Sequence, residues 1–113
     1  MDFDVVHYYI YFYTKVNGEC PAMRWITDHK DEGGLARSMI RCLSNLGLEC
    51  GFISGLTTKD IDELKSKAGQ VRVYYSIMDN FALILNAGFK KDQKNDIKKS
   101  IEYLEDFRRR RPL

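Results

Sequence analysis

The hydrophobic residues of the chain follow three successive patterns: a continuous apolar run, a helical period and a period of two. Val5–Tyr13 is rich in Val, Ile, Tyr and Phe and is interrupted only by His7, which is typical of a strand buried on much of both faces. Pro21 then opens a stretch with helical spacing, Gly33-Gly34 separates it into two helices, and Gly47 ends the second. The first half therefore predicts a strand followed by a helical hairpin.

The period of two predicts three further strands joined by tight turns. Ile61–Ala68 is the weakest candidate, Val71–Ile77 alternates regularly, and Phe81–Phe89 has the apolar content of an inner strand. The residues expected to face the core are Leu64, Val71, Val73, Tyr75 and Ile77. Those expected to point outward are Glu63, Lys65, Lys67, Arg72, Tyr74 and Ser76. Asn95 or Asp96 can cap a last helix from about Ile97 to Arg109.

Together these elements predict an α+β fold in a single domain, residues 1–113. Its parts are an N-terminal strand, a helical hairpin, a three-strand antiparallel meander that completes one sheet, and a C-terminal helix. The chain has 113 residues, of which 44% are hydrophobic and 30% are charged. This composition is typical of a globular domain and excludes a disordered or collagen-like chain.

The cysteines and the N-terminus indicate the compartment. Cys20, Cys42 and Cys50 are odd in number and lack C-x-x-C spacing, which argues against a disulfide framework and against a zinc site. The chain begins Met1-Asp2-Phe3-Asp4, which is acidic where a signal peptide is basic. The longest apolar run is far shorter than the roughly 20 residues of a membrane helix. We therefore expect a soluble cytoplasmic protein.

Charge is distributed unevenly along the chain. The formal net charge is only +2, but residues 1–86 carry nine basic and eleven acidic side chains, whereas residues 87–113 carry nine and five. The C-terminal quarter is therefore basic, which is compatible either with a solvated helix and tail or with an anionic partner.

Common catalytic motifs are missing from the sequence: it contains no Walker loop, G-x-G-x-x-G, G-x-S-x-G or H-E-x-x-H. His7 is interpreted as a packed structural histidine and His29 as solvated, because neither has an obvious partner in sequence. Asp60, Asp62 and Glu63 are interpreted as turn and strand-surface carboxylates. Hydrolase triads and metal catalysis are therefore disfavoured, and we expect no metal and no cofactor.

A cationic face remains as the candidate site. Lys65, Lys67 and Arg72 lie on the outward sides of strands expected to be adjacent, and further lysines follow the last strand and open the terminal helix: Lys90, Lys91, Lys94, Lys98 and Lys99. Such a surface suits phosphate. Tyr74 is two residues from Arg72 on the same face. It can either stack on an unpaired RNA base or simply cover the edge of the sheet.

Several stretches, in the same order along the chain, resemble the RelE/HigB toxin superfamily, and most closely its phage-derived, HigB-like branch. That branch has a first helix after "G-x-x-P-V", then "YELR", a core strand of the type "YRVLYF", and "LLHGFxKKTQKTP". The corresponding residues here are Gly18-Glu19-Cys20-Pro21-Ala22, Asp62-Glu63-Leu64-Lys65, Gly69-Gln70-Val71-Arg72-Val73-Tyr74-Tyr75, Ile84-Leu85, and Gly88-Phe89-Lys90-Lys91 with Gln93-Lys94. The last of these is the most specific.

The resemblance implies one RelE/HigB-like toxin domain of a type II toxin–antitoxin pair. Its partners would be mRNA on the ribosome and a cognate antitoxin, expected to be a helix-turn-helix DNA-binding protein. Family members usually cleave mRNA without a metal, through attack of the 2′-hydroxyl on the adjacent phosphate. On that pattern Arg72 and Lys91 would bind the scissile phosphate and Lys65 or Lys67 would be the base. Lys90 and Lys94 would hold flanking RNA, and Tyr74 and Lys98 of the cationic face are the further residues that we expect to bind it.

The sequence also departs from the family pattern. The family's His before Gly-Phe is Ala87, its Arg after "EL" is Lys65, and its Thr-Pro after the final Lys is Asn95-Asp96. Two alternatives to an endoribonuclease therefore stay open. One is a catalytically degenerate member that binds RNA or an antitoxin, and the other is a gyrase inhibitor like those of the ParE branch of the same fold.

Overall fold

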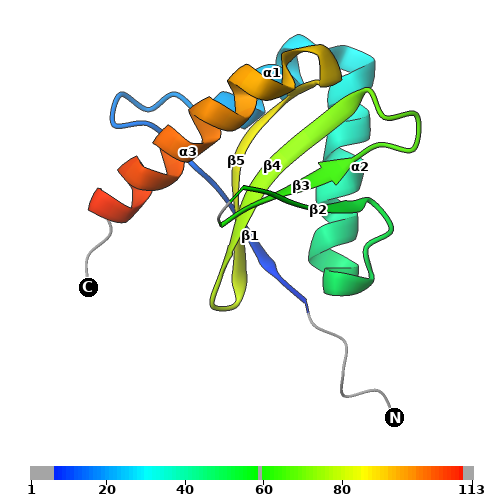
Figure 1. The fold of residues 1–113 in the computed structure, drawn as a ribbon, viewed down its shortest axis with the longest axis horizontal. Coiled ribbons are helices and arrows are strands. Elements are labelled where there is room, and N and C mark those ends of the chain that lie inside the picture. Colours follow the sequence, from blue (N-terminus) through cyan, green and yellow to red (C-terminus); the bar gives the residue numbers. More distant parts are fainter. Residues whose placement is uncertain (1–6, 59, 111–113) are drawn as a thin grey trace.

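The computed structural model describes residues 7–58 and 60–110, which form three α-helices and one mixed sheet (Figure 1). The strands are β1 (Tyr9–Phe12), β2 (Ile53–Thr58), β3 (Ile61–Lys65), β4 (Val71–Met78) and β5 (Phe81–Phe89). The helices are α1 (Pro21–Asp28), α2 (Lys30–Leu46) and α3 (Gln93–Arg110), with short 3₁₀ turns η1 (Gly47–Glu49) and η2 (Lys90–Asp92). The predicted α+β class is therefore correct.

The sheet has the strand order β1-β5-β4-β3-β2. β1 runs parallel to β5, and every other neighbouring pair is antiparallel. The predicted meander of three strands lacks one strand, because Ile53–Thr58 also pairs in the sheet as β2. Its register against β3 shifts twice, and Gly55 interrupts it, so its hydrophobic residues do not alternate over a useful length.

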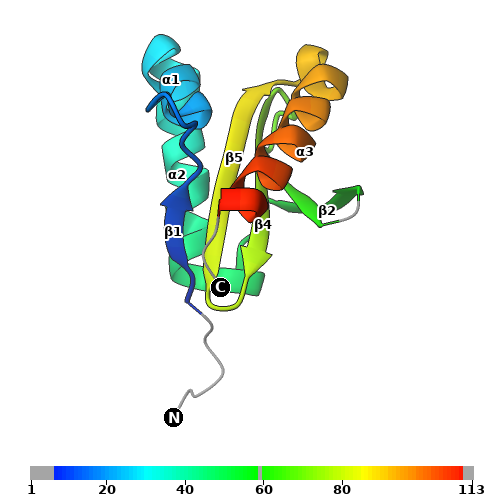
Figure 2. The ribbon, with the colours of Figure 1, turned by 90° about the vertical axis from the view of Figure 1, so that its left-hand side faces the viewer.

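Helices cover both faces of the sheet (Figure 2): α1 and α2 lie on one side, and α3 crosses the other. The predicted alternation in β4 is confirmed, since Val71, Val73 and Tyr75 pack under α1 and α2 while Tyr74 belongs to the core under α3. However, the second face does not point outward. Arg72, Tyr74 and Ser76 are all buried, because α3 lies over this face.

The first strand differs from its prediction. Val5 and Val6 of the expected Val5–Tyr13 strand lie outside the described residues, and the described strand is only Tyr9–Phe12. It is not buried on both faces, because it is the edge strand next to β5: Tyr9 and Tyr11 are 67% and 57% exposed. His7 is also exposed rather than packed.

The helix boundaries are shifted as well. α1 ends and α2 begins around His29, so Gly33 and Gly34 lie inside α2 rather than between the helices. Gly47 does end α2, as predicted. The last helix begins at Gln93, before the expected cap at Asn95 or Asp96.

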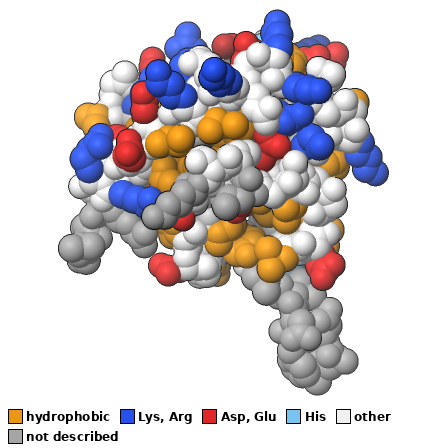
Figure 3. Space-filling model, in the orientation of Figure 1, with side chains coloured by type: hydrophobic (Ala, Val, Ile, Leu, Met, Phe, Trp, Pro, Cys, Tyr) orange, Lys and Arg blue, Asp and Glu red, His pale blue; other side chains and the backbone are white. Residues whose placement is uncertain are grey.

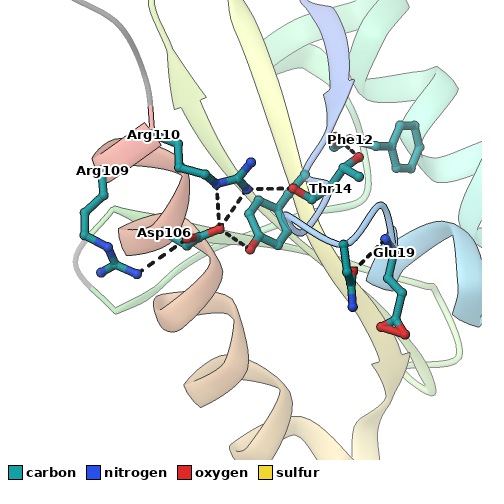
Figure 4. Close-up of polar contacts among 8 residues, drawn as sticks. Phe12, Thr14, Glu19, Asp106, Arg109 and Arg110 are labelled. Carbon is teal, nitrogen blue, oxygen red and sulfur yellow. Dashed lines mark hydrogen bonds and ion pairs between the residues drawn. The ribbon is translucent and has the colours of Figure 1, made fainter.

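A polar cluster fixes the C-terminal end of α3 beside the end of β1 (Figure 4). The Tyr13 hydroxyl donates to Asp106 Oδ2 at 2.6 Å, and Arg110 donates to the same oxygen and to the Thr14 carbonyl, each at 2.7 Å. Burial and the nearby Asp106 carboxylate raise the pKa of Tyr13 to about 12. The hydrogen bonds from Tyr13 and Arg110 hold the pKa of Asp106 below its usual range.

Candidate nucleic-acid interface

Five exposed lysines lie at one end of the sheet, where β3 ends, β4 begins and β5 leads into α3. We call this set the lysine-rich end: Lys65, Lys67, Lys90, Lys91 and Lys94. The strand register explains the convergence, since Lys65 is paired with Arg72 on β4, and Arg72 with Gly88 on β5. Figure 3 shows Lys and Arg side chains gathered over this end.

Backbone contacts fix the two halves of the lysine-rich end relative to each other. The amide of Lys90 donates to the Gln70 carbonyl at 2.8 Å, which joins η2 to the β3–β4 turn that carries Lys67. Lys98 is also exposed and lies one helical turn beyond Lys94 on α3. The structure therefore brings together the strand lysines and the lysines after β5.

Arg72, the predicted phosphate ligand, is not on this surface. Its residue is 6% exposed, and its guanidinium donates to Glu63 Oε1 at 3.1 Å and to the Gly69 carbonyl at 3.1 and 3.2 Å. Gln93 on α3 donates to the same Glu63 oxygen at 2.6 Å. Glu63, expected at the surface of its strand, is only 4% exposed. Arg72 holds the β3–β4 turn instead of facing solvent.

Tyr74, predicted to stack on an RNA base, is fully buried beneath α3. Its hydroxyl is the one buried side-chain polar atom without a hydrogen-bond partner among the described residues. Burial is also the largest cause that raises its pKa, followed by the Glu63 carboxylate. Both faces of the ring are covered by protein, so the stacking prediction does not fit this structure.

Asp96 is a residue that the sequence indicated only as a possible helix cap. Its carboxylate packs against Gly88, and a Cβ at that position would overlap the carboxylate. The absence of a side chain at Gly88 therefore lets the first turn of α3 pack closely on the sheet. Burial, and to a smaller extent Asp92, raise the pKa of Asp96 to about 6, while Lys99 acts in the opposite direction. The signal available in the sequence was Gly88 in a strand interior, which often marks such a close approach.

Asp96→Asn is expected to stabilise the protein at neutral pH. The pKa of Asp96 is about 6 in the folded state and about 3.9 in the unfolded state. The folded state therefore keeps the proton to higher pH, and the free energy of unfolding falls as the pH rises from 4 through 6. Allowing for its partial exposure, we expect a gain of about 1–2 kcal/mol at pH 7.5 and almost none at pH 4. Urea unfolding at both pH values measures this; an equal effect at both would contradict it.

His29 is half-buried rather than solvated. Its Nδ1 lies 2.8 Å from the Trp25 carbonyl oxygen, and its ring stacks on Trp25 with centroids 4.5 Å apart. Phe89 packs against both rings edge-on. This aromatic cluster could not be predicted from the sequence, because its three residues come from α1, the position between α1 and α2, and the end of β5.

Comparison of the chain with models of protein families and with curated proteins gave no match. Among the described residues, no group of three or more His, Cys, Asp or Glu side chains is placed to hold a metal ion. Within the same residues, none of the helices has the length and apolar character needed to cross a membrane. The candidate site is thus defined by its exposed lysines.

Proposed function

We propose that the chain is the toxin of a type II toxin–antitoxin pair and cleaves mRNA on the ribosome. The observation that carries this proposal is the lysine-rich end, where five exposed lysines from β3, the β3–β4 turn, η2 and α3 lie at the same end of the sheet. Clustered cations of this kind bind the phosphate backbone of nucleic acids. The family resemblance lies in the same residues, above all in Phe89-Lys90-Lys91 with Gln93-Lys94.

The proposed chemistry needs no metal. A lysine amine, Lys65 or Lys67, removes the proton of a ribose 2′-hydroxyl, and the 2′-oxygen attacks the adjacent phosphorus. The P–O5′ bond breaks, which leaves a 2′,3′-cyclic phosphate, and the departing 5′-oxygen takes up a proton from a lysine ammonium of the same cluster. Lys91 stabilises the negative charge that develops on phosphate, and Lys90, Lys94 and Lys98 hold flanking RNA.

In this proposal Arg72 acts as a positioning residue. Its guanidinium holds the Gly69 carbonyl, and thereby the β3–β4 turn from which Lys67 projects. This role replaces the phosphate contact expected from the sequence. The partners would be the ribosome, mRNA and a cognate antitoxin of the helix-turn-helix type, in the cytoplasm. A short neighbouring reading frame that encodes such a protein would support the assignment.

The triple variant Lys67→Gln, Lys91→Gln and Lys94→Gln is expected to lose RNA binding. Removal of three phosphate contacts should weaken binding of a single-stranded oligo(U) by about 30-fold at low salt. It should also reduce the slope of log K against log salt by about 2. Fluorescence anisotropy at several salt concentrations measures both quantities. In cells, codon-phased mRNA 5′ ends that follow induction of the wild type should disappear with the variant.

A matched control removes three exposed cations from α2: Lys30→Gln, Arg37→Gln and Arg41→Gln. This variant lowers the net charge by the same amount but keeps the lysine-rich end. Its salt slope and its mRNA cuts should therefore stay close to those of the wild type. Equal losses in the two triple variants would mean that net charge, and not the lysine-rich end, governs binding. Intact transcripts during growth arrest by the wild type would exclude the nuclease.

A non-cleaving RNA-binding protein is the second candidate, and a specific observation favours it. Arg72 is engaged with Glu63 and Tyr74 is buried, so two of the residues that were predicted to contact RNA lie below the surface. The purified protein on programmed ribosomes separates the two functions. Binding without new mRNA 5′ ends supports the non-cleaving protein, and any phased cleavage excludes it.

A further inference from the structure

A second polar feature, lined by none of the five lysines of the lysine-rich end, is a cavity of about 290 Å³ between α1 and α3. It exists because β1 pairs with β5 only as far as Ile84, so Asn86 and Ala87 have no strand beside them on that edge among the described residues. Helices α1 and α3 and the segment before α1 close the space. We call it the α1–α3 pocket. Its volume is at the lower end of small-molecule sites.

The polar groups of the pocket form a compact set of donors and acceptors. Asp96 and Lys99 are three residues apart on α3, hence on one face of the helix, and both line the pocket. Asn86 is only 6% exposed and lines it as well. Its Oδ1 accepts from the Ala87 amide at 2.9 Å, and its side-chain amide nitrogen is a second polar atom of the same residue.

The walls are aromatic. Trp25, which is backed by His29, and Tyr103, which stacks on Tyr13 with centroids 4.9 Å apart, both line the pocket. The other charged groups of the lining pair with one another: Lys15 and Arg24 each pair with Glu19, at 3.5 and 3.6 Å, and Arg24 also lies 3.9 Å from Asp28. Such a lining, with aromatic side chains, a carboxylate, a lysine and an amide, suits a flat, uncharged ring with several hydrogen-bonding groups better than it suits a phosphate.

We infer that the α1–α3 pocket binds an unpaired guanine base, with the Asp96 carboxylate accepting from N1–H and N2–H and Lys99 donating to O6. Guanine alone presents two adjacent N–H donors beside a carbonyl oxygen on its Watson–Crick edge. Adenine, cytosine and uracil each place an acceptor where Asp96 would need a donor. Unpaired bases are read on this edge by side chains in RNA-binding proteins. The Asn86 amide nitrogen supplies a further donor to the ring.

The guanine could belong to RNA or to a free nucleotide, since both carry the same edge. That it belongs to mRNA rests on the proposed function. In that case the pocket, which shares the first turns of α3 with the lysine-rich end, would select the base while the lysines hold the backbone. The two features depend on different residues, so they can be tested separately.

Trp25 is the only tryptophan of the chain and lies in the pocket wall, so its fluorescence reports occupancy. We expect saturable quenching by guanosine monophosphate at pH 7.5, with the adenosine, cytidine and uridine monophosphates at least about tenfold weaker. Asp96→Asn should remove most of this preference, because one carboxylate oxygen becomes a donor. Asp92→Asn is the matched control, since Asp92 is exposed and does not line the pocket. It should bind like the wild type.

Equal quenching by the four nucleotides, or no saturable quenching, would overturn the guanine pocket. So would an Asp96→Asn variant that keeps the full preference while its fold is intact by circular dichroism. RNA is tested by comparing oligo(U) with the same oligomer carrying one guanine. If the wild type binds guanosine monophosphate but neither RNA, the proposed function fails and the pocket stands as a nucleotide site. If it binds both RNAs equally and no nucleotide, the pocket fails and RNA binding stands.

Discussion

Replacing Arg72 by methionine is expected to lower the free energy of unfolding by about 3–5 kcal/mol. The side chains of Arg72 and Glu63 are 7% and 5% exposed, and their ion pair measures 3.1 Å. Removal of the guanidinium leaves the Glu63 carboxylate buried with Gln93 as its one side-chain donor among the described residues. It also leaves the Gly69 carbonyl without its two bonds from Arg72. Urea unfolding monitored by circular dichroism measures the loss.

Two controls separate the ion pair from general effects of the substitution. Arg37→Met removes an exposed arginine from α2 and should change stability by less than about 0.5 kcal/mol. The double variant Arg72→Met and Glu63→Met should recover most of the stability, because no buried charge is left without a partner. A single variant as stable as the wild type would mean that the guanidinium is free, as the sequence first indicated, and available for phosphate.

This prediction also affects how activity data should be interpreted. An Arg72 variant that loses toxicity does not identify a catalytic residue, because it has also lost the bond that holds the β3–β4 turn. Lys67 lies in that turn and is exposed, so its substitution tests the RNA contact without breaking a buried interaction. The exposed lysines are therefore the informative targets for the proposed function.

The sequence predicted the faces of β4 correctly but not what covers them. A period of two assigns Val73 and Tyr74 to opposite sides, yet it cannot say whether a later helix packs on the polar-looking side. α3 does so with few buried residues, among them Leu104, and its charged residues hide that role. The burial of the Glu63–Arg72 ion pair could not be predicted for the same reason. Two charged side chains at strand positions usually indicate a solvated face.

The lysines of the candidate site could be predicted because exposed charges remain at the surface wherever the strands end. The residues of the α1–α3 pocket could not. Trp25, Asn86 and Asp96 come from three different elements, and the pocket depends on where β1 stops pairing with β5. A β-bulge at Leu85, where the register shifts between Tyr74 and Tyr75, contributes to the placement of Asn86. Hydrophobic periodicity contains no information on either feature.

Replacing Gly33 by alanine is expected to lower the free energy of unfolding by about 3 kcal/mol, although alanine is the better helix former. Gly33 is buried within α2, and a Cβ there would overlap the carbonyl oxygen of Ile26 in α1 and come within 2.8 Å of its carbonyl carbon. Both obstacles are backbone atoms, so no change of rotamer relieves the overlap. The two helices must move apart, and the core against α1 loosens with them.

Gly34→Ala is the matched control, because the two glycines are neighbours in the same helix and a Cβ at Gly34 meets nothing within 4 Å. It should raise the free energy of unfolding by about 0.5–1 kcal/mol, since alanine restricts the unfolded chain and favours helix. Opposite signs at adjacent positions would establish that Gly33 serves the contact between α1 and α2. Equal stabilisation by both substitutions would instead mean that the helices are not in close contact at Ile26.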